Sequence, residues 1–255
     1  MSAPPPSAVA VIPARMGSSR FPGKPLAPLL GRPMIEHVYR RVAMSRAVRE
    51  TYVATCDEEI RKAAEAFGAP VIMTSPAHER ASERVAEAAR ALAADIVVLV
   101  QGDEPMTTPG MVDAAVAPMQ ADPSIGCANL AARITTEAEW RDPNTIKVVM
   151  DRRGNALYFS RQPIPSCARG FDRVPVFKQV CVIPFRRATL LEYAALAPTP
   201  LERAESIDMM RLLEHGRAVR MVETDACSHA VDTDDDRRRV EALLREDPLS
   251  RTYLG

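Results

Sequence analysis

The sequence predicts an α/β protein with a mainly parallel sheet and a smaller antiparallel hairpin lobe. Two observations carry this prediction. In the first half of the chain, short β-branched runs alternate with longer helical patterns, which indicates βαβ units with right-handed crossovers. After about residue 125, strand-like runs follow one another with turns between them, and this pattern favours antiparallel pairing.

The first half is expected to contain strands and helices in strict alternation. The run at 96–100 (IVVLV) is continuously apolar, which is typical of a central strand that is covered on both faces. It ends in the polar stretch QGDEP at 101–105. The other expected strands are residues 8–14, 51–56 and 71–74, and the expected helices are residues 34–46, 57–67, 82–94 and 108–121.

The hairpin lobe is expected to be built from strand-like runs at 127–134, 147–150 and 156–160. The turn DRRGN at 151–155 joins the last two runs and predicts a β-hairpin. A stretch with three prolines at 162–176 is expected to be irregular. The remaining expected elements are strands at 177–185 and 219–223 and helices at 200–215 and 234–245.

Composition and charge narrow the class of protein. Of 255 residues, 47% are hydrophobic and 26% are charged, which is typical of a globular protein. The 33 Lys and Arg residues are balanced by 33 Asp and Glu residues, which argues against general nucleic-acid binding. Because no membrane-spanning run or signal-peptide pattern is present, we expect a cytoplasmic protein without membrane contact. The five scattered cysteines lack a CxxC motif and are expected to be reduced.

The segment at 13–24 (PARMGSSRFPGK) carries the strongest functional signal. It holds three cations (Arg15, Arg20 and Lys24), and the small residues between them let backbone N–H groups approach an anion. It follows the first expected strand, and open α/β sheets bind ligands at the carboxyl ends of their strands. The segment therefore predicts a triphosphate site, with a solvated surface loop as the alternative. Neither GxGxxG nor GxxxxGK[ST] is present, which argues against a dinucleotide site and a Walker loop.

Further motifs run in order along nearly the whole chain. With VIPARxxSSRFPGKPL at 11–26, they are VQGDEP at 100–105, NxxKVV at 144–149, ALYFSRxxIP at 156–165, PLE at 200–202 and VDT at 231–233. Through these motifs the chain resembles the sugar-acid cytidylyltransferases, above all the CMP-Kdo synthetases (3-deoxy-manno-octulosonate cytidylyltransferases). The resemblance implies a Rossmann-like nucleotidyltransferase that moves CMP from CTP to an acidic acceptor and releases pyrophosphate.

The resemblance also implies a division of labour along the chain. Residues 1–125 would form the CTP-binding core, and residues 126–200 a lobe for acceptor binding and dimerisation. Residues 201–255 would return to the core with a second metal-binding aspartate. The expected partners are CTP and a small acidic acceptor, in a homodimer.

Individual roles follow from the same resemblance. The positions implied for CTP are Pro13, Ala14, Arg15, Ser18, Arg20, Lys24, Ser82, Arg84 and Gln101. Among them, Ser82 and Arg84 would hold the base and sugar, and Gln101 would contact the nucleotide or the acceptor. Lys24, Arg15 and Asp103 would act in catalysis. A helix capping box is the alternative interpretation of Ser82.

Asp103 and Asp232 are the implied Mg²⁺ ligands. A carboxylate beside a triphosphate is repulsive unless a hard divalent cation lies between them, and Mg²⁺ prefers a few carboxylates together with phosphate oxygens and water. Asp103 directly follows the expected central strand, at the carboxyl edge of the sheet. The structural alternative is that Asp232 or Thr233 caps the last helix and Asp103 caps a turn.

The acceptor half departs from the family pattern. Gln179 and Ile183 stand where the family usually has His and Tyr, and Asp208-Met209 stands where it usually has Glu-Gln. The expected acceptor-binding residues are Gln101, Arg161, Gln179 and Asp208, with Lys147 and Lys178 as further candidates to meet an anion. Kdo or a Kdo-like sugar acid is the first expectation. Because apolar residues leave sugar hydroxyls unpaired, a small phosphonate such as phosphonoformate is the alternative acceptor.

Two other classes of protein are weighed against this interpretation. A nicotinamide-dependent oxidoreductase should show a glycine fingerprint with a later acidic residue, and none is present. A non-catalytic nucleotide-binding protein of the same fold would be expected to lose Asp103, Lys24 or Arg15, and the sequence retains all three.

Overall fold

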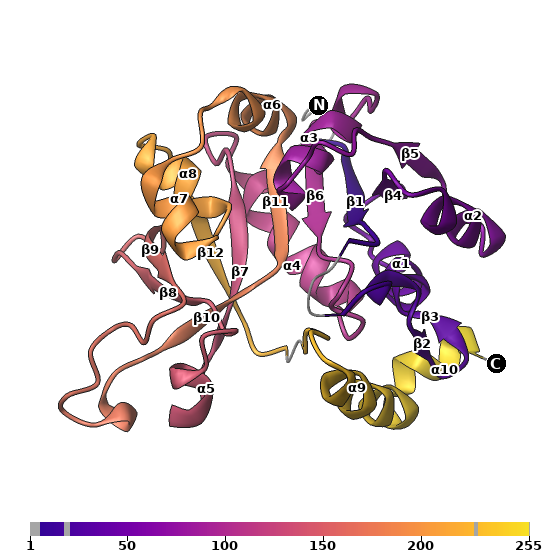
Figure 1. Ribbon diagram of the computed structural model, residues 1–255. Helices are drawn as coiled ribbons and strands as arrows, with labels where there is room; N and C mark the ends of the chain where they lie inside the picture. The colour runs from indigo at the N-terminus through magenta and orange to yellow at the C-terminus, as the bar shows by residue number, and fades with distance from the viewer. Residues whose placement is uncertain (1–5, 18–20, 227–228, 255) are drawn as a thin grey trace.

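The structure, a computed structural model, describes residues 6–17, 21–226 and 229–254. Two five-stranded sheets stand side by side, and a short ribbon of β2 (Pro28–Leu29) and β3 (Arg32–Pro33) lies near the C-terminal helices (Figure 1). One sheet is mainly parallel and the other is mainly antiparallel. The predicted fold class is therefore confirmed.

The first sheet is made of β11 (Val182–Arg186), β6 (Ile96–Val100), β1 (Ala8–Ala14), β4 (Thr51–Thr55) and β5 (Val71–Met73), in that order. Its four strands from the first half of the chain run parallel, and β11 joins the edge of β6 in the antiparallel sense. Every residue of β1 and β6 is buried, which explains why both strands are continuously apolar in the sequence.

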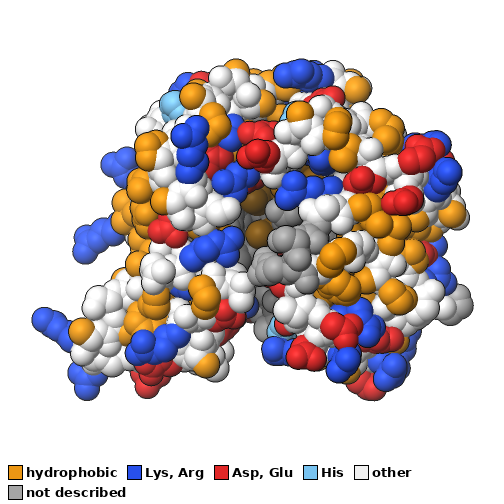
Figure 2. Space-filling model, in the orientation of Figure 1, with side chains coloured by type: hydrophobic (Ala, Val, Ile, Leu, Met, Phe, Trp, Pro, Cys, Tyr) orange, Lys and Arg blue, Asp and Glu red, His pale blue; other side chains and the backbone are white. Residues whose placement is uncertain are grey.

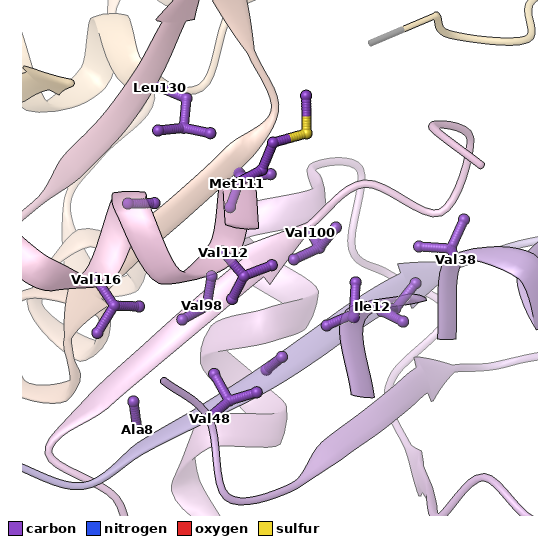
Figure 3. Packing of buried hydrophobic residues seen from close by; sticks show 14 of the residues in the cluster. Ala8, Ile12, Val38, Val48, Val98, Val100, Met111, Val112, Val116 and Leu130 are labelled. Carbon is purple, nitrogen blue, oxygen red and sulfur yellow. The ribbon is translucent and has the colours of Figure 1, made fainter. Parts of the chain in front are cut away.

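Helices cover both faces of the first sheet. On one face lie α1 (Met34–Ala43), α2 (Glu58–Ala66) and α4 (Pro109–Ala121), and on the other lie α3 (Ala81–Arg90) and α6 (Arg187–Ala195). Figure 3 shows the first of these interfaces, where Val98 and Val100 of β6 pack with Val112 and Val116 of α4. Burial of this apolar surface on both sides makes the sheet a rigid base for the loops at its edges.

The second sheet is made of β12 (Arg220–Thr224), β7 (Ala128–Arg133), β10 (Phe177–Val180), β8 (Lys147–Met150) and β9 (Ala156–Ser160), in that order. The β8–β9 hairpin is antiparallel, as the turn at 151–155 predicted. A short helix, α5 (Glu137–Arg141), precedes β8. Its Trp140 packs against Phe171, which belongs to the irregular segment at 162–176.

The predicted single strand at 177–185 is wrong. The chain forms β10 in the second sheet and then β11 in the first sheet, and Cys181 is the residue between them. Both strands have β-branched and apolar residues, so the sequence pattern runs through the crossing without a break. The consequence for the site is that residue 181 lies where the two sheets meet.

The predicted helix at 200–215 is also divided. It consists of α7 (Pro200–Glu205) and α8 (Met209–Glu214), because Ser206 adopts a left-handed conformation with φ 56°. The sequence analysis missed α5, α6, the ribbon and α10 (Pro248–Leu254). These elements are short or lack a clear helical period, which is the signal on which the prediction depended.

The three predicted segments of the chain (1–125, 126–200 and 201–255) do not each correspond to one sheet. β11 belongs to residues 126–200 but extends the first sheet, and β12 belongs to residues 201–255 but extends the second. The functional division of the chain into these segments stays a prediction. Among the described residues, no helix is long and apolar enough to cross a membrane.

A buried arginine ties the C-terminal helices to the sheet. Arg41 of α1 is 1% exposed, and its guanidinium donates to the carbonyl oxygens of Thr107 (2.8 Å) and Met106 (3.3 Å). The same guanidinium pairs with Asp247, which follows α9 (Asp234–Glu246). The loop after β6 and the end of the chain are thus bound to one side chain.

Arg41→Met is expected to lower the free energy of unfolding by about 3–5 kcal/mol, because it leaves a carboxylate and two carbonyl groups without their buried donor. Urea denaturation would measure the change. Arg61→Met is the matched control, since Arg61 pairs with Glu58 and Glu65 on the surface of α2 and its loss should scarcely change the midpoint. Equal effects of the two substitutions would contradict the role assigned to Arg41.

Candidate active site

The carboxyl ends of β1 and β6 meet at one edge of the first sheet, because the two strands are parallel neighbours. Gly102 follows β6 and lies against β1. A Cβ at this position would stand 3.0 Å from the carbonyl oxygen of Pro13, closer than side chains ordinarily approach. The absence of a side chain therefore lets the loop that carries Asp103 lie directly beside Ile12 and Pro13 at the end of β1.

Lys24 connects the two predicted metal ligands. Its Nζ lies 2.6 Å from Oδ2 of Asp103 and 3.1 Å from Oδ1 of Asp232. The Lys24 side chain is 12% exposed, while the carboxylates are 29% and 22% exposed. Three residues from distant parts of the chain thus meet at one partly open point on the sheet edge.

Local backbone contacts hold each of these side chains in place. Gly23 adopts a left-handed conformation (φ 72°), and its N–H donates to the carbonyl of Met16 before Lys24 begins the short helix η1 (Lys24–Leu26). The N–H of Val231 donates to the carbonyl of Asp103 at 2.9 Å. The Asp232 and Asp103 segments are therefore joined through their backbones as well as through Lys24.

The helix at 234–245 that the sequence predicted is α9, and its N-cap is Thr233. Its hydroxyl accepts a hydrogen bond from the N–H of Asp236 at 3.2 Å, at the start of α9. Of the two residues proposed as this cap, Thr233 takes the role, so the Asp232 carboxylate is left to face Lys24.

The electrostatics fit a polyanion and a divalent cation. Burial lowers the pKa of Lys24, but the charges of Asp103 and Asp232 outweigh this effect and the pKa lies above its ordinary value. In the described ranges, no group of three or more His, Cys, Asp or Glu side chains is arranged to hold a metal ion. Two partly exposed carboxylates fit Mg²⁺, which takes its remaining ligands from phosphate and water.

The other predicted CTP positions are placed in part. Pro13 and Ala14 are buried at the end of β1, and Arg15 is exposed immediately after them. Ser18 and Arg20 lie outside the described residues. Gln101 is half-buried, and its backbone N–H donates to the carbonyl of Cys181 at 3.2 Å.

The predicted base and sugar positions lie in the first turn of α3. The N-cap of this helix is Arg80, so Ser82 is a buried residue of the first turn and not the cap. Arg84 is 3% exposed, and its guanidinium donates to the hydroxyl of Thr74 and the carbonyl of Ser75. In this structure Arg84 is therefore turned inward, and its contact with a nucleotide stays a prediction.

Asp208 stands beside the same helix turn. Its Oδ2 accepts a hydrogen bond from the N–H of Ser82 at 3.1 Å, and Arg80 lies 3.8 Å from its Oδ1. Burial raises the pKa of Asp208 above its ordinary range, although Ser82 and Arg80 oppose the shift. The structure thus brings a predicted acceptor residue next to a predicted nucleotide residue.

The remaining acceptor candidates are engaged with other protein groups. The side-chain amide of Gln179 donates to Oδ1 of Asn129 at 2.5 Å, and the guanidinium of Arg161 donates to the carbonyls of Glu205 and Pro143. Lys178 pairs with Glu139 at 2.5 Å. Their contact with an acceptor stays a prediction.

Two of the candidate positions are structural. Lys147 is fully buried, and its ammonium donates to the carbonyls of Asp142, Thr145 and Arg161. Ile183 is 4% exposed and belongs to the hydrophobic core beneath α3 and α6. Neither the expectation that Lys147 meets an anion nor the placement of Ile183 in an acceptor pocket is supported.

Sequence analysis missed the residue that organises this region, Glu205. Its carboxylate accepts hydrogen bonds from the hydroxyls of Tyr158 and Ser160 and from the N–H of Arg161, at 3.1, 2.7 and 2.9 Å. These three residues lie within the matched motif at 156–165, but Glu205 is 44 or more positions away. No local pattern could have connected them.

Figure 2 shows a hollow between the half that contains the first sheet and the half that contains the second, with charged side chains of both signs around it. Charges of both signs around a concave surface suit a small anionic ligand that brings its own counter-ion.

Comparison with known proteins bears directly on this geometry. The family model described as Cytidylyltransferase matches residues 9–222. Over 245 residues the chain is 46% identical to the 3-deoxy-manno-octulosonate cytidylyltransferase of Geobacter metallireducens, with 92% of this chain and 96% of the relative covered. The chain belongs to the CMP-Kdo synthetase family of cytidylyltransferases. The resemblance inferred from the sequence motifs is thereby confirmed.

Other members of the family give the same result. The 3-deoxy-manno-octulosonate cytidylyltransferase of Syntrophotalea carbinolica is 45% identical over 247 residues, covering 94% of this chain and 99% of the relative. Among solved structures, a CMP:2-keto-3-deoxy-manno-octonic acid synthetase complexed with CTP superposes with a TM-score of 0.88 at 41% identity, covering 94% of this chain and 99% of that one. A 4-diphosphocytidyl-2C-methyl-D-erythritol synthase from Anaerococcus prevotii, with a TM-score of 0.63 at 14% identity, shares the fold of this cytidylyltransferase.

Proposed function

We propose that this protein transfers CMP from CTP to 3-deoxy-manno-octulosonate (Kdo) and releases pyrophosphate. The observation that carries the proposal is the convergence of Lys24, Asp103 and Asp232 at the carboxyl edge of β1 and β6. In the reaction, an acceptor hydroxyl attacks the α-phosphorus of CTP. The bond from this phosphorus to the bridging oxygen breaks, and the electron pair leaves with pyrophosphate.

Positioning and charge neutralisation are the main contributions of the protein. Asp103 and Asp232 would hold Mg²⁺, which when bound neutralises phosphate charge and supports the leaving group. Lys24 is fixed within 3.1 Å of both carboxylates, so its ammonium is placed to donate to a phosphate oxygen bound beside them. Arg15, exposed at the end of β1, would meet the outer phosphates.

The acceptor is proposed to lie between the edge of the first sheet and the turn at 206–208, between α7 and α8, which we call the Asp208 turn. Gln101, Arg161, Gln179 and Asp208 would surround it, and for Arg161 this requires exchange of its present carbonyl partners for the acid. Identity of more than 40% over nearly the full chain with relatives named 3-deoxy-manno-octulosonate cytidylyltransferases supports a sugar acid as the acceptor. We also propose a homodimer, on the basis of the family resemblance and the hairpin lobe at 126–200, and a cytoplasmic location.

A pyrophosphate-release assay with CTP and Mg²⁺ tests this function. We expect turnover with Kdo and background release with N-acetylneuraminate and phosphonoformate, because the chain is related to Kdo cytidylyltransferases over nearly its full length. Turnover with phosphonoformate alone would contradict Kdo as the acceptor. It would indicate that the predicted acceptor residues, Gln179 among them, bind a phosphonate. CTP binding without turnover of any acid would contradict catalysis itself.

A further inference from the structure

A single buried guanidinium joins the two halves of the proposed site. Arg211 of α8 is 2% exposed, and its Nη2 donates to Oε1 of Glu202 at 2.7 Å and to Oε1 of Glu83 at 2.8 Å. Its Nε donates to Oε2 of Glu202 at 2.8 Å. The guanidinium also stacks on the ring of Tyr193, with 4.5 Å between the guanidinium carbon and the ring centroid.

The two carboxylate partners of Arg211 come from elements with different predicted roles, one toward the nucleotide and one toward the acceptor. Glu83 lies in the first turn of α3, next to Ser82 and Arg84, which are the predicted base and sugar positions. Its second oxygen, Oε2, accepts from the N–H of Arg80 at 3.4 Å and so closes that turn. Glu202 lies in α7, directly before the Asp208 turn that is proposed to face the acceptor.

Two further bonds repeat the connection. The N–H of Ser82 donates to Asp208 at 3.1 Å, and Nη1 of Arg80 donates to the hydroxyl of Ser206 at 2.9 Å. Residues 126 positions apart in the sequence are thereby in direct contact. Arg211 is the buried centre of this contact, because its guanidinium holds one carboxylate from each side. The more exposed Arg80 supports the same contact, with its Nε 3.8 Å from Oε1 of Glu202.

Stability does not account for a group of this kind. A buried ion pair recovers little more than the cost of its desolvation, and well-packed apolar side chains of similar size stabilise as much. What the forked hydrogen bonds supply is a fixed geometry, since a planar guanidinium with two carboxylates admits few arrangements. The feature that they fix is the spacing between the first turn of α3 and the Asp208 turn.

We infer that Arg211 is a positioning residue. It fixes the distance and orientation between the nucleotide subsite on α3 and the acceptor subsite at Asp208. The inference rests on the proposed function, from which it takes the acceptor subsite at Asp208, and on the sequence resemblance, which implies that Ser82 and Arg84 of α3 hold the base and sugar. With Arg211 in place, binding of CTP holds the acceptor side in its reactive position. Without it, the two turns are free to shift and each ligand binds a site that the other no longer helps to order.

The test uses Arg211→Met, which removes the fork at similar length, and Arg211→Lys, which keeps the charge. The dissociation constant for CTP, measured without Mg²⁺ so that no turnover occurs, and the KM for Kdo are both expected to rise about tenfold in Arg211→Met. Arg211→Lys should recover part of both losses. Glu83→Gln should raise both constants in the same direction, and the double variant should be no worse than Arg211→Met, because the two groups act as one unit.

Arg41→Met is the matched control, since Arg41 is equally buried but contacts neither α3 nor α7. It should lower the melting temperature without the paired rise in the two constants. A folded Arg211→Met protein with wild-type values of both constants would overturn the inference. So would a paired rise in Arg41→Met of the same size. If Arg211→Met does not fold, Glu83→Gln decides by the same criterion.

The failure of the proposed function would look different. Wild-type protein that releases no pyrophosphate from CTP with Kdo contradicts the function before any variant is compared. An active wild-type enzyme whose Arg211 variants differ only in melting temperature contradicts the positioning role alone.

Discussion

Asp103→Asn is expected to lower kcat by about 10³-fold or more, with a much smaller change in the affinity for CTP measured without metal. The amide keeps the size of the carboxylate and one acceptor oxygen, but it removes the charge that a divalent cation requires. Because Lys24 lies 2.6 Å from this carboxylate, the substitution also alters the setting of the ammonium. Pyrophosphate release at saturating CTP and Kdo measures the loss.

A second measurement distinguishes loss of metal binding from loss of reaction rate. Binding of Mn²⁺ to the protein–CTP complex, followed by electron paramagnetic resonance, should weaken in Asp103→Asn. Asp235→Asn is the matched control, because that carboxylate belongs to the first turn of α9, close to Asp232 in the chain, but is 92% exposed. It should change neither measurement. Full activity in Asp103→Asn would contradict the place of Asp103 in the reaction.

The parallel half of the fold was predictable because its signals are local. β6 reads as five consecutive apolar residues and is buried on both faces, and α3 and α4 keep a helical period between short connections. The crossing at Cys181 was not predictable in this way. Whether residues 177–185 form one strand or two depends on where the second sheet ends against the first, and that is decided by packing of distant segments.

The contacts of the candidate site likewise include some that the sequence could predict and some that it could not. The meeting of Lys24 with Asp103 could be expected, because both follow neighbouring parallel strands and such strands end at one edge. The roles of Lys147 and Glu205 could not. A buried lysine that donates to three carbonyls has the same one-letter code as a lysine that meets a substrate, and only the three-dimensional contacts distinguish them.

The two positions at which the acceptor half departs from the expected family pattern, Ile183 and Gln179, have different surroundings in the structure. Ile183 fills core space beneath α3 and α6, so a change at this position alters packing before it alters a pocket. Gln179, by contrast, is half-buried on β10 and makes one side-chain hydrogen bond to Asn129. Of these two positions, Gln179 is therefore the one whose predicted contact with the acceptor remains open.

Lys24→Met is expected to have the largest combined effect. It removes the only ammonium seen between Asp103 and Asp232 in the described part of the chain, so two carboxylates that are 29% and 22% exposed face each other without it. The free energy of unfolding should fall by about 1 kcal/mol, a modest loss because both groups remain partly solvated. The value of kcat/KM should fall by about 10³-fold, because the phosphate loses a charged donor at the reacting centre.

Lys24→Arg separates the two effects. The guanidinium restores the positive charge between the carboxylates, so the denaturation midpoint should return close to that of the wild type. Activity should remain well below the wild type, because a planar fork cannot place its donors where a compact ammonium at 2.6 Å from Asp103 stands. If Lys24→Arg recovered both stability and rate, charge alone would be sufficient at this position. If Lys24→Met kept its rate, the phosphate site would lie elsewhere on the sheet edge.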